Sequence, residues 1–260
     1  HRYAKLTIQW GKNLIENKMP EAHWYTEIME RGGTLVTVCP EYNPPSTKAD
    51  YWIPCRAGLS DISVFLGAAK IIMDEGLVDV PYVKQYTDMP LLVRTDNLTR
   101  LHPDDYIPGY KGQALPKDGF TTKWMKNFNR DKMPDFVVWD TNTDKPVAIT
   151  REDIGAKMRK KNIDPALDGV YDIKLVNGKT ITAMPLYEMY KIHLKDYDLD
   201  TTHQISHAPK DLVVRLARDM GTILPVEIHY GEGINHYFHA TMHNRASYVP
   251  LMLTGNVGPK

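Results

Sequence analysis

Two short apolar runs, each followed by a residue that breaks a strand, constrain the fold of this chain more than any other feature. Leu6–Trp10 ends at Gly11, and Thr34–Cys39 ends at Pro40. Apolar runs of this length favour strands that helices cover on both faces, as in parallel sheets. A helical pattern at residues 21–31 lies between them. The order strand, helix, strand predicts a parallel sheet with helices outside it.

The same alternation continues along much of the chain. A short strand at residues 51–53 precedes a helical pattern at residues 60–75, whose apolar positions form one stripe. A helix at residues 209–220, a strand at residues 224–229 and a helix at residues 235–248 are predicted near the C-terminus. The fold class is therefore predicted to be α/β, with a Rossmann-like parallel sheet.

The segment between about residues 101 and 200 has a different character. Residues 136–149 read as one hairpin, and residues 172–183 read as another around Asn177-Gly178, a strong hairpin signal. We interpret this segment as an insertion rich in β-hairpins. We predict an α/β lobe over residues 1–222, which carries the insertion, and the truncated start of a second α/β lobe over residues 223–260.

Composition excludes several classes of function. The 260 residues carry no net charge, with a pI near 7.3, which argues against a nucleic-acid-binding protein. No apolar run approaches the ~20 residues of a membrane helix. Cys39 and Cys55 lack the spacing of a metal site and are predicted to be free thiols, with a single disulfide as the alternative. The chain begins without Met and ends in a Gly-rich stretch, which we interpret as an internal piece of a longer protein.

Three loops that follow predicted strands are candidate ligand sites, because open α/β sheets bind ligands at the carboxyl ends of their strands. Each has an ordinary structural alternative: a tight turn for the first, a proline turn for the second and a helix cap for the third. In chain order, the candidate residues are Trp10, Gly11 and Asn13, then Pro40 and Glu41, then Gly58, Ser60 and Asp61.

The fourth candidate loop contains Gly231 and Gly233, followed by Asn235 and His236. A double-glycine loop between a strand and a helix is a shape that binds anions. His236, His239 and His243 would share a helix face at this spacing. A histidine metal site is nevertheless disfavoured, since the spacing is not that of a known zinc motif and no local carboxylate completes the set. No metal ligand is assigned.

The order and spacing of these segments resemble one protein family. The motifs are Trp-Gly-x-Asn after a strand, Pro-Glu-Tyr after the next strand, Ala-Asp-x-Trp-Ile-Pro-x-Arg-x-Gly at residues 49–58, Gly-x-Gly-x-Asn-His, and Thr-Gly-Asn-Val-Gly. Together they resemble the molybdopterin oxidoreductases of the dimethyl-sulfoxide-reductase superfamily. Residues 86–93 and Asn235-His236 are similar to the branch that holds nitrate reductase, nitrite oxidoreductase, selenate reductase and chlorate reductase. The resemblance covers essentially the whole chain.

This resemblance implies that the chain is part of a larger multidomain molybdoenzyme. The implied cofactor is molybdenum bis(molybdopterin guanine dinucleotide). By position, Trp10, Gly11 and Asn13 would line one dinucleotide, and Pro40 and Glu41 would lie near its guanosine end. Gly231, Gly233, Asn235 and His236 would face the pterins and the substrate funnel, with His236 and Asn235 as the catalytic candidates. The family's iron–sulfur ligands and its molybdenum-ligating Asp match no segment here, so the chain alone is expected to be inactive.

One departure from the family pattern concerns the guanine-binding acid. Relatives commonly carry Gly-Thr-Asp where this chain has Gly58-Leu59-Ser60-Asp61, so Asp61 or Ser60 would take that role. This departure resembles nitrite oxidoreductases and implies oxygen-atom transfer between nitrite and nitrate. Selenate or chlorate reduction is the alternative within the family, and a non-catalytic nucleotide-binding module is the alternative outside it. The implied partners are a small anionic substrate, an iron–sulfur electron-transfer subunit and a haem subunit. The implied location is a bacterial membrane-associated complex, on the periplasmic side in preference to the cytoplasmic side.

Overall fold

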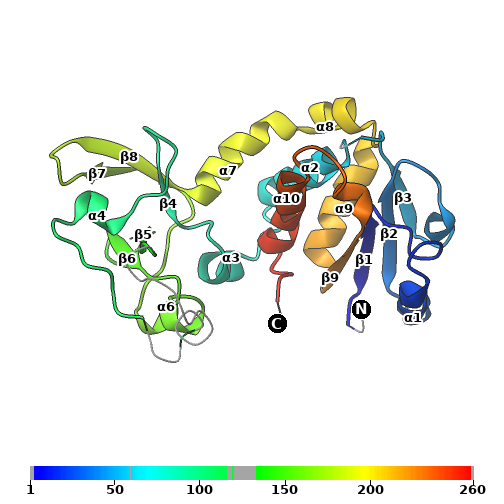
Figure 1. Cartoon of the computed structure of the whole chain (residues 1–260), viewed down its shortest axis with the longest axis horizontal. Coiled ribbons are helices and arrows are strands. Elements are labelled where there is room, and N and C mark those ends of the chain that lie inside the picture. The colour runs from blue at the N-terminus through cyan, green and yellow to red at the C-terminus, as the bar shows by residue number, and fades with distance from the viewer. Residues whose placement is uncertain (1–2, 59, 116–118, 120–132, 259–260) are drawn as a thin grey trace. The chain divides into compact units, whose positions relative to one another are not determined.

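A computed structural model of the chain describes residues 3–58, 60–115, 119 and 133–258. The chain forms two compact units (Figure 1). Unit 1 comprises residues 1–79 and 193–260, and unit 2 comprises residues 80–192. Unit 2 is thus inserted into unit 1, and it begins earlier in the sequence than the insertion predicted from residue 101.

A four-stranded parallel sheet forms the centre of unit 1. Its strands are β1 (Leu6–Trp10), β2 (Thr34–Cys39), β3 (Tyr51–Pro54) and β9 (Val226–Tyr230), in the order β3-β2-β1-β9. β1 pairs in parallel with both β2 and β9, so the carboxyl ends of these strands meet at one edge (Figure 1). The predicted α/β fold with a parallel sheet is confirmed. All five residues of β1 are buried, as expected for a strand covered on both faces.

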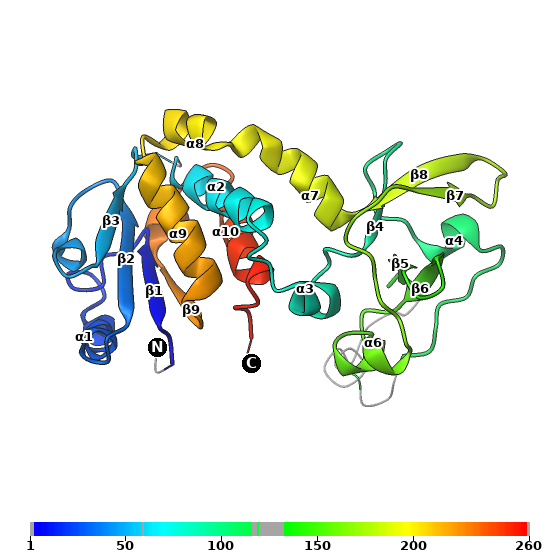
Figure 2. The ribbon, with the colours of Figure 1, turned by 180° about the vertical axis from the view of Figure 1, so that it is seen from behind.

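Helices cover the two faces of this sheet. The 3-10 helix η1 (Met19–Glu21) and α1 (Ala22–Glu30) lie on one face, where Tyr25 and Ile28 pack with Leu14 and Leu35. On the other face, α2 (Asp61–Asp74) packs against three helices, α8 (Leu199–Ser206), α9 (Lys210–Thr222) and α10 (Ala240–Leu253) (Figure 2). Because α2 has neighbours on several sides, its middle residues are buried beyond the single predicted stripe. Three short 3-10 helices complete unit 1: η2 (Pro44–Thr47), η4 (Lys195–Tyr197) and η5 (Glu232–Ile234).

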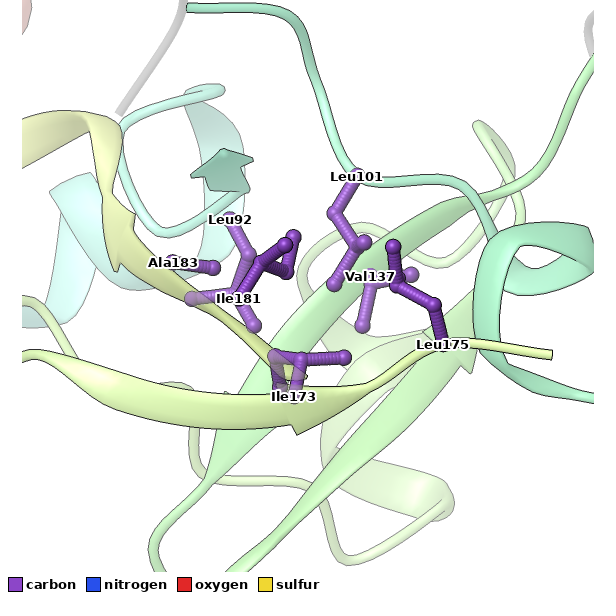
Figure 3. Close-up of a cluster of buried hydrophobic side chains, with 7 residues drawn as sticks. All are labelled: Leu92, Leu101, Val137, Ile173, Leu175, Ile181 and Ala183. Carbon is purple, nitrogen blue, oxygen red and sulfur yellow. The ribbon is translucent and has the colours of Figure 1, made fainter. Parts of the chain in front are cut away.

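Unit 2 contains two small antiparallel sheets. One consists of β4 (Leu92–Arg94), β8 (Thr180–Pro185) and β7 (Tyr171–Lys174), and the other of β5 (Phe136–Asp140) and β6 (Lys145–Ile149). Both predicted hairpins are present, as β5–β6 and β7–β8. Among the described residues, the helices that accompany them are α3 (Val80–Tyr86), α4 (Pro103–Tyr106), α6 (Ala156–Lys160) and α7 (Leu186–Leu194). Figure 3 shows the buried cluster between the strands, which includes Leu92, Val137 and Ile173.

One prediction about the C-terminal segment needs correction. The helix predicted at residues 235–248 begins at Ala240, because residues 232–234 form a 3-10 turn and His239 adopts a left-handed backbone with φ +61°. The lobe boundary at residue 222 stays a prediction. β9, which lies after it, is hydrogen-bonded to β1 in register from Leu6↔Val226 to Trp10↔Tyr230.

Candidate functional site

A cavity of about 290 Å³ opens where the four loops converge at the carboxyl ends of the strands in unit 1. It brings together most of the residues singled out in the sequence. Those that line it are Gly11, Asn13, Pro40, Glu41, Gly58, Asp61 and Gly233. Trp10, Ser60, Gly231, Asn235 and His236 are not among the residues that line it. Parallel strands place their carboxyl ends at one edge of a sheet, which explains why loops distant in sequence meet here.

Asp61 is the half-buried acid of the cavity, and Trp10 holds it in place. Asp61 is the first residue of α2, and its Oδ2 accepts a hydrogen bond from Nε1 of the fully buried Trp10. Burial raises the pKa of the Asp61 carboxyl above its ordinary value, and the bond from Trp10 partly offsets that rise. His243 of α10 also favours the ionised form of Asp61. Trp10 therefore contacts Asp61 but does not itself line the cavity. The resemblance had implied that Trp10 would line one dinucleotide.

Ser60 does not face the cavity. Its side chain is buried, and its hydroxyl donates a hydrogen bond to the backbone carbonyl of Arg56. Of the two residues that could replace the family's usual acid, only Asp61 reaches the cavity. Asp61 is thus the better placed of the two, and its role in binding guanine stays a prediction.

Glycines lock the first and fourth loops together. Gly11 adopts φ +59°, and its carbonyl accepts a hydrogen bond of 2.9 Å from the Gly233 amide. A Cβ on Gly231 would lie 2.3 Å from the Gly11 carbonyl oxygen, and one on Gly233 would lie 2.7 Å from it. Gly231 itself has extended backbone, with φ −130°. These two glycines are therefore required by the close approach of the loops, a role that the sequence alone did not reveal.

The sequence analysis missed several side chains that line the cavity. They are Lys12, Asn17, Asn43, Cys39, Cys55, Arg56, Glu232 and Tyr237. Both cysteines are free and buried, and burial raises the pKa of the Cys55 thiol to about 12. They are therefore protonated thiols at neutral pH and not reactive thiolates. Lys12 directly follows Gly11, and Arg56 lies two residues after the end of β3. A basic residue in a loop that follows a strand was the signal that could have identified them.

Asn235 and His236 lie on an exposed turn between η5 and α10. The Asn235 side chain accepts a hydrogen bond of 2.9 Å from Asn244 Nδ2. Since α10 begins only at Ala240, His236 does not lie at a helix N-terminus. The helix predicted at residues 235–248 therefore does not begin beside His236. The predicted roles of both residues rest on the resemblance alone.

No helix among the described residues is long and apolar enough to cross a membrane. Within the same residues, no group of three or more His, Cys, Asp or Glu side chains is placed to hold a metal ion.

Comparisons with known proteins identify relatives along nearly the whole chain. No protein-family model matches it. The perchlorate reductase subunit alpha of Dechloromonas aromatica is 28% identical over 98% of this chain and 28% of its own length. The respiratory nitrate reductase subunit alpha of Haloferax mediterranei is 29% identical over 98% of this chain and 25% of its own length. The chain therefore spans about a quarter of the length of these curated relatives.

A solved structure has a similar fold. Acetylene hydratase from Pelobacter acetylenicus matches 97% of this chain and 22% of its own chain, with a TM-score of 0.54 and 15% sequence identity. At this identity the likeness concerns the fold alone. The relatives found by sequence and this shared fold agree with the motif order that the sequence carries. Over nearly its whole length, the chain is a homologue of the alpha subunits of molybdopterin oxidoreductases.

Proposed function

We propose that this chain is part of the catalytic subunit of a molybdenum oxidoreductase, and that its cavity holds one guanosine end of a molybdopterin guanine dinucleotide. The observation that carries the proposal is the Asp61 carboxylate, which Trp10 orients in the lining of a cavity that Glu41 also lines. A guanine edge presents two neighbouring N–H donors, which a carboxylate can accept together.

Other features of the cavity suit such a ligand. Its volume lies near the lower end of the ~300–1,000 Å³ typical of ligand pockets, which fits one end of the cofactor better than the whole. Gly58 has φ +89°, and no atom lies within 4 Å of the place where its Cβ would stand, so a ligand can approach the backbone there. Lys12 and Arg56 supply positive charge for phosphate groups.

The cofactor, when bound, would supply the redox chemistry, for which we propose the oxidation of nitrite with water to nitrate, two protons and two electrons, or the reverse reaction. In this scheme the residues of this chain bind and orient the nucleotide end. We propose further that His236 and Asn235 face the substrate funnel, where the imidazole donates a hydrogen bond to an oxygen of the anion.

The nucleotide assignment is tested by Asp61→Ala in the complete enzyme. Loss of a hydrogen bond to a charged partner costs about 1.5–3 kcal/mol, so molybdenum and pterin content should fall. Asp74→Ala is the matched control, because Asp74 lies on the same helix and pairs with Lys70 at the surface. Full cofactor content in the Asp61 variant would refute the assignment of Asp61 to the nucleotide. Absence of molybdenum and pterin from the wild-type protein would favour a non-catalytic module.

The catalytic assignment is tested by His236→Ala. Turnover should fall at least ~10-fold, or about 1.4 kcal/mol of transition-state stabilisation, with molybdenum content retained. His239→Asn is the control, since Asn tolerates the left-handed backbone at that position. Equal turnover in the two variants would remove His236 from the site.

The substrate is tested by comparing nitrite oxidation with nitrate, chlorate and selenate reduction by the complete enzyme. The relatives named above act, by their names, on perchlorate and nitrate, and a third is the chlorate reductase subunit alpha of Ideonella dechloratans. We expect the highest kcat/KM for the nitrite and nitrate pair. A chlorate or selenate value higher by an order of magnitude would assign the chain to that activity instead.

The relatives are named as alpha subunits, which supports a complex of several subunits. We propose that the complete protein passes electrons to an iron–sulfur subunit and a haem subunit, in a membrane-associated complex on the periplasmic side. Cell fractionation followed by affinity purification should recover these subunits together from the membrane fraction. Recovery of the catalytic subunit alone from the cytoplasmic fraction would contradict this assembly.

A further inference from the structure

Lys12 is a largely buried cation in the wall of the cavity. It directly follows Gly11 at the end of β1, and its side chain is only 8% exposed. The side chain lines the cavity together with Asn13 and Gly233. A buried ammonium group needs an anionic partner, because burial penalises an unpaired charge severely.

The backbone of Lys12 is held firmly by the neighbouring loop. A Cβ added to Gly231 would lie 2.6 Å from the Lys12 Cβ and 2.8 Å from the Lys12 Cα. The chain at Lys12 is therefore packed directly against the glycine loop that follows β9. The start of the lysine side chain has little freedom, and its direction is set by the fold.

Glu21 is the carboxylate that pairs with Lys12. It ends η1 and caps α1, and its side chain is 41% exposed. The ion pair with Lys12 is the main cause that lowers the pKa of Glu21, and His229 and Lys18 add to the effect. The pair therefore joins the buried side chain of a residue that lines the cavity to a carboxylate that is partly exposed to solvent. Glu21 can move away from the ammonium group at a smaller cost than Lys12 can move out of the wall.

A second ion pair, between Lys18 and Glu232, is more exposed to solvent than the pair of Lys12 and Glu21. Lys18 pairs with Glu232 at 3.0 Å, and their side chains are 38% and 58% exposed. Exposed pairs of this kind contribute little, because water and salt screen them. Lys18 thus provides a matched cation that lies close in sequence but is not buried in the cavity wall.

We infer that Lys12 binds a phosphate group of the nucleotide in this cavity, and that Glu21 is a positioning residue that holds the lysine and competes with that phosphate. This inference rests on the proposed nucleotide site. A phosphate that enters takes the place of Glu21 as the partner of the buried ammonium group. A nucleoside diphosphate can replace Glu21 as the partner of Lys12, and a nucleoside without phosphate cannot. The cavity can distinguish the two ligands in this way.

The test uses the complete protein purified from a host that cannot make the cofactor. Isothermal titration calorimetry with GDP and with guanosine separates contacts to phosphate from contacts to the base. Lys12→Met should weaken GDP binding at least tenfold and change guanosine binding less than twofold. Lys12→Arg should keep GDP affinity within threefold, and Lys18→Met, the control, within twofold. Glu21→Gln should tighten GDP binding at least threefold, with guanosine binding unchanged.

The outcomes separate this inference from the proposed function beneath it. If the wild type binds neither GDP nor guanosine, the nucleotide site fails and the inference falls with it. If the wild type binds GDP and Lys12→Met binds it equally well, the nucleotide site survives and the role of Lys12 is refuted. Weaker GDP binding by Glu21→Gln would refute the competition. Retained guanosine binding shows that each variant is folded.

Discussion

At the scale of single residues, Asp61 shows how a binding site can oppose stability. Its carboxyl is half-buried at the start of α2, and the hydrogen bond from Trp10 compensates only partly for lost hydration. Burial is the larger effect, so the pKa in the folded state lies above the usual 3.8. A raised pKa means that the folded protein favours the protonated acid. The stability that protonated Asp61 contributes is present below pH 3.8 and is lost as pH rises through the folded pKa.

Asp61→Asn should therefore stabilise the cofactor-free protein at neutral pH. The amide oxygen can still accept the bond from Trp10, and no charge remains to be dehydrated. The melting temperature of the variant should exceed that of the wild type at pH 7, and the gap should narrow towards pH 4. Differential scanning fluorimetry across this range measures the gap. A gap that is independent of pH would contradict the role of ionisation.

Gly231 is a residue whose importance comes from close packing. Gly231→Ala would place a methyl group 2.3 Å from the Gly11 carbonyl oxygen, a backbone atom that cannot yield easily. Overpacking of this kind costs about 1–3 kcal/mol, and we expect unfolding free energy to fall by that amount. Gly32→Asn is the control, because Gly32 has φ +72° with open space around it and Asn tolerates that backbone. Urea denaturation that shows equal loss in both variants would contradict the packing argument.

At the scale of elements, the sequence predicted what local periodicity and turn residues determine. Leu6–Trp10, Thr34–Cys39 and the Asn177-Gly178 hairpin are all present, because continuous apolar runs and an Asn-Gly pair leave few alternatives. The predicted start of α10 was wrong by five residues. A histidine does not signal a left-handed backbone, so the sequence could not show that the helix begins only after His239. Ser60 could not be separated from Asp61 by sequence, because only the geometry of the first turn of α2 decides which side chain faces the cavity.

One apolar cluster joins strands from both sheets of unit 2. Leu92 of β4 is fully buried there with Ile173 and Ile181 (Figure 3). Leu92→Ala should cost about 2–5 kcal/mol of stability, through lost burial and the cavity left behind. Val176→Ala is the control, since Val176 is 52% exposed and its loss should change stability by less than ~0.5 kcal/mol. Chemical denaturation followed by circular dichroism measures both, and a mild Leu92 variant would show that the cluster does not hold the strands.

At the scale of the whole molecule, the chain has two units with separate cores. Unit 1 is built around the parallel sheet, and unit 2 around its own antiparallel strands. Units with separate cores need not unfold together. The cavity residues all belong to unit 1, so damage to the core of unit 2 should leave the proposed nucleotide site in place.

Calorimetry should therefore resolve two unfolding transitions. Leu92→Ala should lower only the transition of unit 2, and GDP should raise only the transition of unit 1. The fluorescence of Trp10, buried beside the cavity, can report unit 1 in a variant that lacks the other tryptophans. A single transition that shifts as one under both changes would show that the units unfold as one cooperative body.

The register between β1 and β9 has a consequence for the order of events during protein synthesis. Leu6 pairs with Val226, and the glycine lock joins Gly11 to Gly231 and Gly233. A growing chain that has left the ribosome only as far as α8 has β1, β2 and α2 but lacks the fourth strand. The pocket wall formed by Gly233 and Tyr237 does not yet exist at that stage. Loading of the proposed nucleotide would therefore have to wait until residue 237 has emerged, because an early nascent chain lacks part of the cavity wall.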